Sequence, residues 1–357
     1  QQQPPSTFTS SIMSAKSGVE LRQLGKNGPL VPRIGLGCVP LGGGAYGVAL
    51  SDEERLALLD EAYNIGARFW DTADEYADAE DVLGKWFRAN PEKRKDITLA
   101  TKFAIRPGEE QRSRFIVDSS PEYCRQAIEK SLSRLGVSYV DIYYIHRLDK
   151  VTPIEKTMEV LVELKNQGKI KHIGLSECSA ASLRRGHAVH PVSCVQLEYS
   201  LFCRVIETPQ APLLETAREL GVAVVAYGPL NSGLLSGAIR TREDISKPGD
   251  LRGMVPALRE ENLSNNVGIV EKISEIAKDV GATNSQLALA WLLAQGDDIF
   301  PIPGTTKIHR LRENTASMSI SISSEQNQKL RELASDFAGQ RVQELLGHAF
   351  GDSAPLQ

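Results

Sequence analysis

The chain has 357 residues, of which 41% are hydrophobic and 24% charged, so it contains enough apolar side chains for a sizeable core. A formal net charge of −4 provides no basic surface for nucleic acid or an anionic membrane, and no window has the roughly 18 consecutive apolar residues of a membrane span. We therefore expect a soluble protein with neither kind of partner.

The two ends of the chain differ in composition from its centre. Residues 1–17 are polar, rich in Ser and Pro, and lack the apolar centre of a signal peptide, so we interpret them as a disordered or artificial extension. Residues 19–24 and 30–32 flank a Gly-Lys-Asn-Gly turn and predict a β-hairpin that closes the floor of the following domain. We expect a single domain over residues 18–340 and a C-terminal tail over 341–357.

Short apolar runs alternate with helical stretches through the centre of the chain. Eight runs are strand candidates, and most of them have the near-continuous apolar character of parallel strands that are buried on both faces. They are residues 33–38, 68–72, 97–102, 140–146, 171–176, 193–199, 222–227 and 299–303. Eight strands in strict alternation with helices predict an α/β fold, a closed (β/α)8 TIM barrel with an N-terminal hairpin and extra C-terminal helices.

Helix boundaries carry their own signals. Three helix starts show capping patterns, namely Ser51 with Glu54, Ser120 with Pro121, and Thr152 with Glu155 around Pro153. Glycines at 136, 168 and 221 stand where helices must end. After the seventh strand, residues 231–263 form a long polar loop, a typical lid or binding segment, and helices follow at about 265–280 and 284–294.

An open doubly wound sheet is the competing architecture. Its dinucleotide-binding fingerprint is GxGxxG at the start of a helix, and the glycines at 35, 37, 42, 43 and 44 do not match that spacing. The closed barrel is therefore favoured.

The cysteines point to a reducing compartment. Cys38, Cys124, Cys178, Cys194 and Cys203 are odd in number, form no CxxC pair and have no histidine at zinc-ligand spacing. We expect free thiols, no metal site and a cytoplasmic location.

Four chemically active side chains fall where the active site of a TIM barrel lies, at the C-terminal ends of the strands. Asp71 ends the second strand and Tyr76 follows it, Lys102 ends the third, and His146 ends the fourth. Each has a plain alternative: a structural ion pair, a packing tyrosine, or a hydrogen-bonded histidine near the core. Together they predict proton delivery, with Lys102 lowering the pKa of the Tyr76 phenol and Asp71 holding the ammonium group.

A resemblance extends this reading. Several segments of the chain resemble segments of the aldo-keto reductases and occur in the same order. They are Asp71–Tyr76, Thr101-Lys102, the run 141–146, Gly174-Leu175-Ser176, the runs 195–200 and 226–230, and the segment 302–307 with Arg310, Glu313 and Asn314. The resemblance implies a tetrad of Asp71, Tyr76, Lys102 and His146 with Tyr76 as the general acid. It also implies NADPH as the hydride source, because none of these side chains can reduce a substrate.

The resemblance assigns cofactor contacts to three regions. Ser176 and Gln196 would hold the nicotinamide carboxamide, Tyr227 would stack on its ring, and Gly228, Leu230 and Ser232 would meet the pyrophosphate. The adenosine 2′-phosphate would bind at the start of a helix, to Gly304, Thr305, Thr306, Lys307 and Arg310. The adenine would lie at Glu313 and Asn314. Taken singly, Lys307 and Arg310 are also compatible with an ordinary solvated face.

Two positions depart from the pattern that the resemblance implies. Glu177 stands where many family members have a carboxamide-binding Asn, and Ala77 where a Gly often follows the tyrosine. The Gly-Leu-Ser-Glu form is most similar to the pyridoxal-reductase-like branch.

The leading hypothesis is NADPH-dependent reduction of a small aromatic or apolar aldehyde or ketone, with pyridoxal as one candidate. The pocket would comprise residues 39–46, 103–115, 202–206 and the 231–263 loop, with Tyr46, Phe103 and Phe202 as apolar walls and Arg106, Arg112, Arg114 and Arg204 as receptors for an anionic group. An NADPH-binding regulatory or sensor subunit and a Schiff-base lyase that uses Lys102 are the alternatives.

Overall fold

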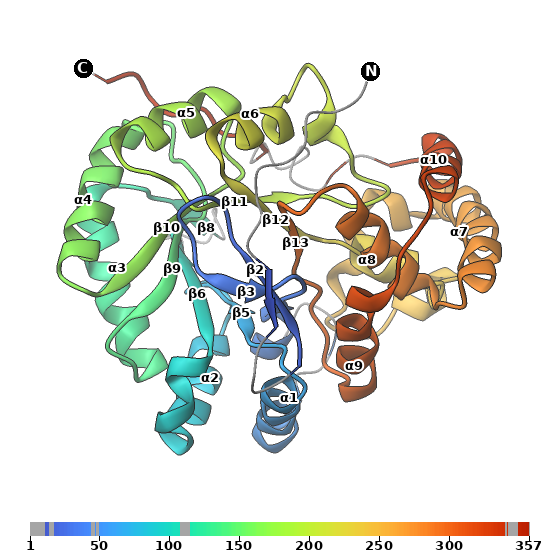
Figure 1. Ribbon diagram of the computed structural model, residues 1–357, viewed down its shortest axis with the longest axis horizontal. Helices are drawn as coiled ribbons and strands as arrows, with labels where there is room; N and C mark the ends of the chain where they lie inside the picture. The colour runs from blue at the N-terminus through green and yellow to red at the C-terminus, as the bar shows by residue number, and fades with distance from the viewer. Residues whose placement is uncertain are drawn as a thin grey trace.

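Eight parallel strands form a closed (β/α)8 barrel (Figure 1) in the computed structural model, which describes residues 11–13, 18–43, 47, 50–107, 115–339, 341 and 349–356. In barrel order they are β4 (Leu36–Gly37), β5 (Phe69–Asp71), β6 (Thr98–Phe103), β9 (Val140–Ile145), β10 (Ile170–Ser176), β11 (Cys194–Glu198), β12 (Ala223–Tyr227) and β13 (Ile299–Pro301). The first and last strands meet through Gly35 N to Pro301 O at 2.9 Å and Gly37 N to Pro303 O at 3.2 Å. The expected barrel is thus confirmed.

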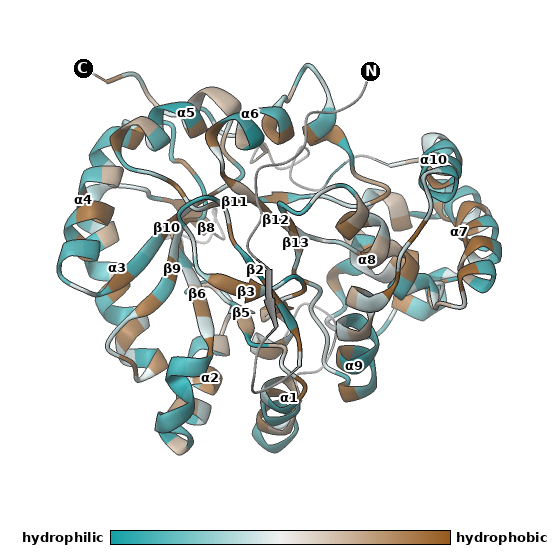
Figure 2. Ribbon diagram, in the orientation of Figure 1, coloured by the Kyte–Doolittle hydropathy of each residue, from teal (hydrophilic) through white to brown (hydrophobic). Residues whose placement is uncertain are grey.

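Helices surround the strands (Figure 1). They are α1 (Asp52–Asn64), α2 (Ala79–Ala89), α3 (Pro121–Leu135), α4 (Ile154–Asn166), α5 (Ala180–Val189), α6 (Leu213–Leu220), α7 (Glu260–Val280), α8 (Asn284–Ala294), α9 (Ile308–Ala316) and α10 (Ser324–Leu333). Apolar residues concentrate on the strands and on the helix faces turned toward them (Figure 2), as a two-layer core requires. No helix in the described ranges is long and apolar enough to cross a bilayer.

The predicted hairpin closes the barrel floor. Strands β2 (Glu20–Gln23) and β3 (Leu30–Pro32) pair antiparallel, and Leu24 and Val31 are fully buried in one apolar cluster with inward-facing side chains of the barrel. Within the expected N-terminal extension, β1 (Ser11–Met13) pairs with β2. The rest of that extension lies outside the described residues, and the division of the chain into domain and tails stays a prediction.

Several local predictions were wrong. Thr152 does not cap α4; its hydroxyl and its backbone N–H both donate to Asp149 at 2.8 and 2.7 Å, and Glu155 pairs with Arg185 instead. The predicted loop 231–263 contains four short 3-10 helices, and α7 begins within it at Glu260, earlier than the expected start at about residue 265. A small hairpin, β7 (Ile105–Pro107) with β8 (Phe115–Val117), follows β6. The capping patterns at Ser51 and Ser120 are confirmed.

Candidate active site

The predicted tetrad converges on one end of the barrel. Asp71 is the last residue of β5, Lys102 lies near the end of β6, and His146 directly follows β9. Tyr76 lies in the turn between β5 and α2, with its backbone N–H donating to Ala73 O. Because parallel strands end at the same rim, three strands and one turn bring these groups together.

Lys102 is the centre of the group. Its ammonium donates to Asp71 Oδ1 at 2.6 Å, to Thr72 O at 2.8 Å and to the Tyr76 hydroxyl at 3.1 Å. The side chain is 0% exposed and Asp71 is 1% exposed, so these contacts are shielded from water. An ammonium group has three donors, and all three are used.

A glycine allows the approach of the loop that carries Tyr76. A Cβ on Gly42 would lie 2.1 Å from the backbone oxygen of Tyr76, which is too close for any side chain to fit there. Gly42 belongs to the glycine-rich segment after β4, so part of that segment lets the loop that carries Tyr76 pack closely against it.

The protonation states of Lys102 and Tyr76 follow from burial and from each other. Burial alone would lower the pKa of Lys102, but Asp71 and Tyr76 outweigh it and hold the pKa above its ordinary value. Burial raises the pKa of Tyr76, and the nearby Lys102 opposes this without reversing it. The expectation that Lys102 brings the Tyr76 pKa below its ordinary value was therefore wrong. Tyr76 keeps its proton at neutral pH, which is the state that a proton donor needs.

His146 is neutral in this environment. Burial, with help from the positive charges of Arg147 and Lys102, holds the pKa of His146 well below its ordinary value. Its ring meets that of Tyr76 edge-on, with the centroids 5.9 Å apart, and its Nδ1 is 3.9 Å from Glu75 Oε1. Nδ1 has no hydrogen-bond partner in the described part of the chain. Glu75 and Arg147 were not singled out from the sequence, although each adjoins a predicted tetrad residue.

Asp74 lies behind the site and titrates abnormally. Burial, reinforced by Glu80 and Glu75, raises its pKa to about 8. The folded state therefore holds an extra proton between the unfolded pKa of about 4 and pH 8, and stability falls as the pH rises through that window.

Asp74→Asn is expected to remove this dependence. Relative to the wild type, the variant should gain on the order of 5 kcal/mol of unfolding free energy at pH 8 but not at pH 4. Urea unfolding followed by circular dichroism at pH 4, 6 and 8 measures the difference. An equal effect at all three values would contradict the assigned titration.

The predicted phosphate-binding segment lies at the start of α9. Lys307 precedes the helix, and its N–H donates to the Thr305 hydroxyl at 3.0 Å. Lys307 and Arg310 are exposed, and neither side chain has an ion-pair partner among the residues described. Gly304 packs against Gly37 and Pro40, which places the segment beside the barrel seam.

The predicted nicotinamide contacts lie on neighbouring strands. Ser176 ends β10 and accepts a bond from Arg147 at 3.2 Å, while Gln196 on β11 donates to Asp71 Oδ2 at 2.8 Å. Tyr227, the last residue of β12, donates its hydroxyl to Glu177 Oε1 at 3.0 Å. Gln196 thus touches the predicted tetrad directly, a contact that sequence reasoning did not anticipate.

The turn after β12 has an unusual backbone. Gly228, Asn231 and Ser232 have φ values of 63°, 49° and 55°, and of these residue types Ser is the one that seldom adopts such values. Successive N–H groups in such turns form concave anion sites, in keeping with the pyrophosphate contact predicted for Gly228, Leu230 and Ser232. At the adenine end, Glu313 accepts from the Thr283 hydroxyl and Asn314 is buried in α9.

Comparison with known proteins identifies the family. The sequence profile of the Aldo/keto reductase family matches residues 33–335, which is most of the chain. The chain belongs to the aldo/keto reductase family. It is therefore an oxidoreductase, as the resemblance implied.

Curated relatives agree with this assignment. Aldo-keto reductase str7 of Strobilurus tenacellus is 43% identical over 319 residues, which cover 88% of this chain and 92% of the relative. Aldo-keto reductase yakc [NADP(+)] of Schizosaccharomyces pombe is 41% identical over 316 residues, with 88% and 91% coverage.

Solved structures of the family share the fold. The thermostable aldo-keto reductase Tm1743, determined with the inhibitor epalrestat, has a TM-score of 0.69 and 29% identity, covering 88% of this chain and 99% of that one. The glycerol dehydrogenase AKR11B4 from Gluconobacter oxydans has a TM-score of 0.78 and 26% identity, with coverages of 90% and 97%. No comparison specifically supports the pyridoxal-reductase-like branch.

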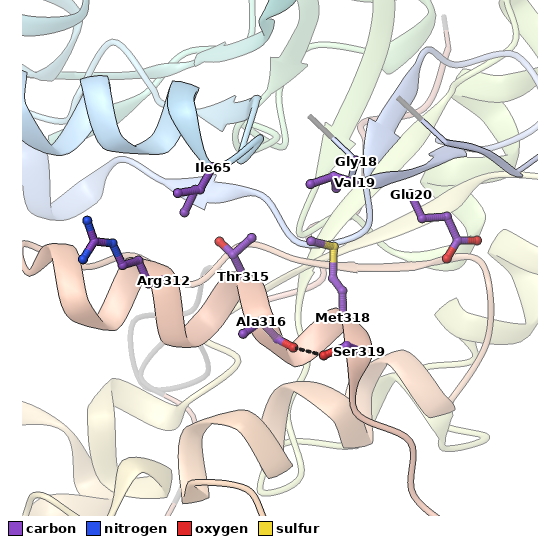
Figure 3. A pocket seen from close by; sticks show the side chains of 9 residues that line it. All are labelled: Gly18, Val19, Glu20, Ile65, Arg312, Thr315, Ala316, Met318 and Ser319. Atoms are coloured by element: carbon purple, nitrogen blue, oxygen red, sulfur yellow. Dashed lines mark hydrogen bonds between the residues drawn. The ribbon is translucent and has the colours of Figure 1, made fainter. Parts of the chain in front are cut away.

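A surface groove of about 420 Å³ is separate from this site (Figure 3). It is lined by Gly18, Val19, Glu20, Ile65, Arg312, Thr315, Ala316, Met318 and Ser319. These residues come from the floor hairpin and from the C-terminal ends of α1 and α9, so the groove is at the barrel end opposite to the reductase site.

The predicted substrate pocket is only partly as expected. Phe103 is no pocket wall, because it is fully buried and stacks on Tyr143 with the ring centroids 5.2 Å apart. Arg106 pairs with Asp118 at 3.2 Å. Phe202 and Arg204 line a second groove of about 490 Å³. Tyr46, Arg112 and Arg114 lie outside the described residues.

Proposed function

We propose that this aldo/keto reductase reduces a small aldehyde or ketone to the alcohol with NADPH, and that Tyr76 supplies the proton. The observation that carries the proposal is the shielded chain from Asp71 to Lys102 (2.6 Å) to the Tyr76 hydroxyl (3.1 Å). Such a chain keeps a cation beside the phenol oxygen, where negative charge appears once the proton has left.

The protein groups divide the reaction among them. NADPH, when bound, supplies the hydride that adds to the carbonyl carbon. Neutral His146 donates a hydrogen bond that orients the carbonyl oxygen, and the Tyr76 hydroxyl transfers its proton to that oxygen as its charge develops. Lys102 stabilises the resulting phenolate until water reprotonates it.

The residues of the site fit this cofactor. Thirteen buried side-chain polar atoms lack a hydrogen-bond partner in the described ranges, and three of them belong to regions assigned to cofactor or substrate: His146 Nδ1, Asn231 Oδ1 and Asn314 Oδ1. An unpaired buried polar atom is unfavourable, so ligand groups are suitable partners for these three atoms. The yeast relative whose name includes NADP(+) supports the choice of NADPH.

Lys307 and Arg310 are proposed to select NADPH over NADH. Replacing both with Met removes two charge-assisted contacts to the 2′-phosphate, and the NADPH preference in kcat/KM is expected to fall by about 10- to 100-fold. NADH-dependent turnover should stay within about twofold, since NADH lacks the phosphate. Lys329→Met, a substitution on α10, is a suitable control; an unchanged NADPH preference in the double variant would place the phosphate elsewhere.

The substrate class is proposed to be a small aromatic or apolar carbonyl. Phe202 stacks on Phe337, with the ring centroids 4.4 Å apart, at the second groove and supplies an aromatic wall beside Arg204. NADPH oxidation measured against aryl aldehydes, diketones, pyridoxal and charged aldehydes tests this directly. Turnover confined to anionic carbonyls would overturn it in favour of recognition by Arg204.

The alternatives receive less support. A Schiff-base lyase needs a neutral lysine, whereas the pKa of Lys102 is held above its ordinary value by Asp71 and Tyr76, against the effect of burial. No feature of the described residues favours a regulatory subunit.

A cytoplasmic location is proposed because all five cysteines are buried free thiols.

A further inference from the structure

Glu177, the residue after β10, has a fully buried carboxylate with an unusual set of partners. Its Oε1 accepts from the Tyr227 hydroxyl at 3.0 Å, from Glu198 N at 3.1 Å and from Arg341 Nη2 at 2.7 Å. Its Oε2 accepts from Phe350 N at 3.4 Å. The carboxylate is therefore committed to the protein and not directed at the place of a carboxamide ligand.

Arg341 connects this carboxylate to a second one. Its Nη2 pairs with Glu177 at 2.7 Å and its Nε with Glu198 at 2.8 Å, and its guanidinium lies 4.6 Å from the ring centroid of Phe350. The Arg341 side chain is 7% exposed. A guanidinium between two carboxylates in a shielded place is a strong anchor, because removing it would leave buried charge unpaired.

The C-terminal segment is attached at the same point. Gly351 N donates to Glu177 O at 2.7 Å and Ser179 N donates to Gly351 O at 3.0 Å, so Gly351 forms a parallel bridge with Cys178. Beyond it, Ser353 N donates to the Ser182 hydroxyl at 2.8 Å. The end of the chain is thus bonded to the loop that carries Glu177.

We propose that Glu177 is a positioning residue for the nicotinamide: it fixes the Tyr227 ring through its hydroxyl and, through Arg341, makes the C-terminal segment part of the cofactor site. The inference rests on the proposed function and on the cofactor contact that the family resemblance implies, in which the nicotinamide stacks on Tyr227. A ring held in place before binding loses less conformational freedom on binding, so the anchor increases cofactor affinity.

Three variants separate the parts of this arrangement. Tyr227→Phe removes only the hydroxyl, Glu177→Gln keeps an acceptor for it but removes the charge that Arg341 needs, and Arg341→Met breaks the connection to the C-terminal segment. Two readouts without turnover follow them: the NADPH Kd from tryptophan fluorescence quenching, and hydrogen–deuterium exchange of the peptide that contains residues 349–356.

The expected pattern distinguishes positioning from plain stability. Tyr227→Phe should raise the NADPH Kd about fivefold and leave exchange at 349–356 unchanged, while Glu177→Gln and Arg341→Met should raise the Kd about tenfold and speed that exchange. Asp298→Asn is the matched control, because Asp298 is 1% exposed and paired with Arg218 at 2.8 Å just before β13, at the barrel floor. It should lower the melting temperature and change neither readout.

The outcomes separate this inference from the function on which it rests. A wild-type protein that does not bind NADPH overturns both. A wild type that binds NADPH, together with Tyr227→Phe of unchanged Kd, overturns the positioning role alone, even if a Glu177 variant fails to fold. If Glu177→Gln and Arg341→Met speed exchange at 349–356 without weakening NADPH binding, Glu177 only anchors the end of the chain, and this outcome also overturns the positioning role.

Discussion

Tyr76→Phe is expected to lower kcat for carbonyl reduction by about 10³-fold or more, within the range that general acids contribute. The phenol hydroxyl lies 3.1 Å from the Lys102 ammonium, and phenylalanine keeps the ring contact with His146 while it removes the proton. The measurement is single-turnover NADPH oxidation with the best carbonyl from the panel.

NADPH binding should survive the same change. The Kd of the variant is expected to stay within about twofold of the wild type, because the Tyr76 hydroxyl is not among the groups predicted to hold the cofactor and bonds to Lys102 instead. Tyr63→Phe, which removes a hydroxyl bonded to Asp96 at 2.7 Å near the end of α1, is the control and should keep full turnover. Substantial turnover by Tyr76→Phe would assign the proton to another group.

Lys102→Met should lose both activity and stability. Methionine fills a similar volume but leaves the Asp71 carboxylate buried without a cation, with Gln196 and Tyr144 as its side-chain donors. An uncompensated buried charge costs about 3–5 kcal/mol of unfolding free energy. Without the cation the Tyr76 phenolate is no longer stabilised, so kcat is expected to fall by about 10³-fold or more.

A double variant separates the two effects. Asp71→Asn with Lys102→Met removes the stranded charge, so it should recover most of the lost stability in urea unfolding but none of the lost turnover. Recovery of turnover would mean that Lys102 serves the fold and not the proton transfer. The structural ion pair, one of the plain alternatives for these residues, would then be the correct interpretation.

The barrel strands were predictable from sequence because most are buried on both faces and therefore have near-continuous apolar sequences. Helix starts were predictable where one capping residue has one partner, as at Ser51. The start of α4 was not, because Thr152 has two possible partners and Asp149, three residues earlier, accepts both of its donors. Local patterns do not rank such competing bonds.

The site was predictable in composition and less so in electrostatics. Strand ends share one rim, so Asp71, Lys102 and His146 could be placed together in advance. The pKa of Tyr76 depends on how completely the fold covers the phenol, which no local pattern reveals.

Backbone strain was equally hidden. Glu177 and Ala77 have φ values of 46° and 47°, a region in which Gly and Asn are at less of a disadvantage, so both departures from the family pattern occur at left-handed positions. The contact between Arg341 and Glu177 was not predictable either, because it forms only where the far end of the chain returns to Glu177.

The seam between β4 and β13 has a consequence for how the protein is made. The hydrogen bonds from Gly35 and Gly37 go to Pro301 and Pro303. The first strand of the barrel therefore cannot pair with its second neighbour until nearly the whole chain has left the ribosome. During translation β4 and the growing end of the sheet are unprotected edges, which other chains can join. Ribosome-bound chains that stop before residue 299 should therefore depend on chaperones, and release from them should coincide with the emergence of β13.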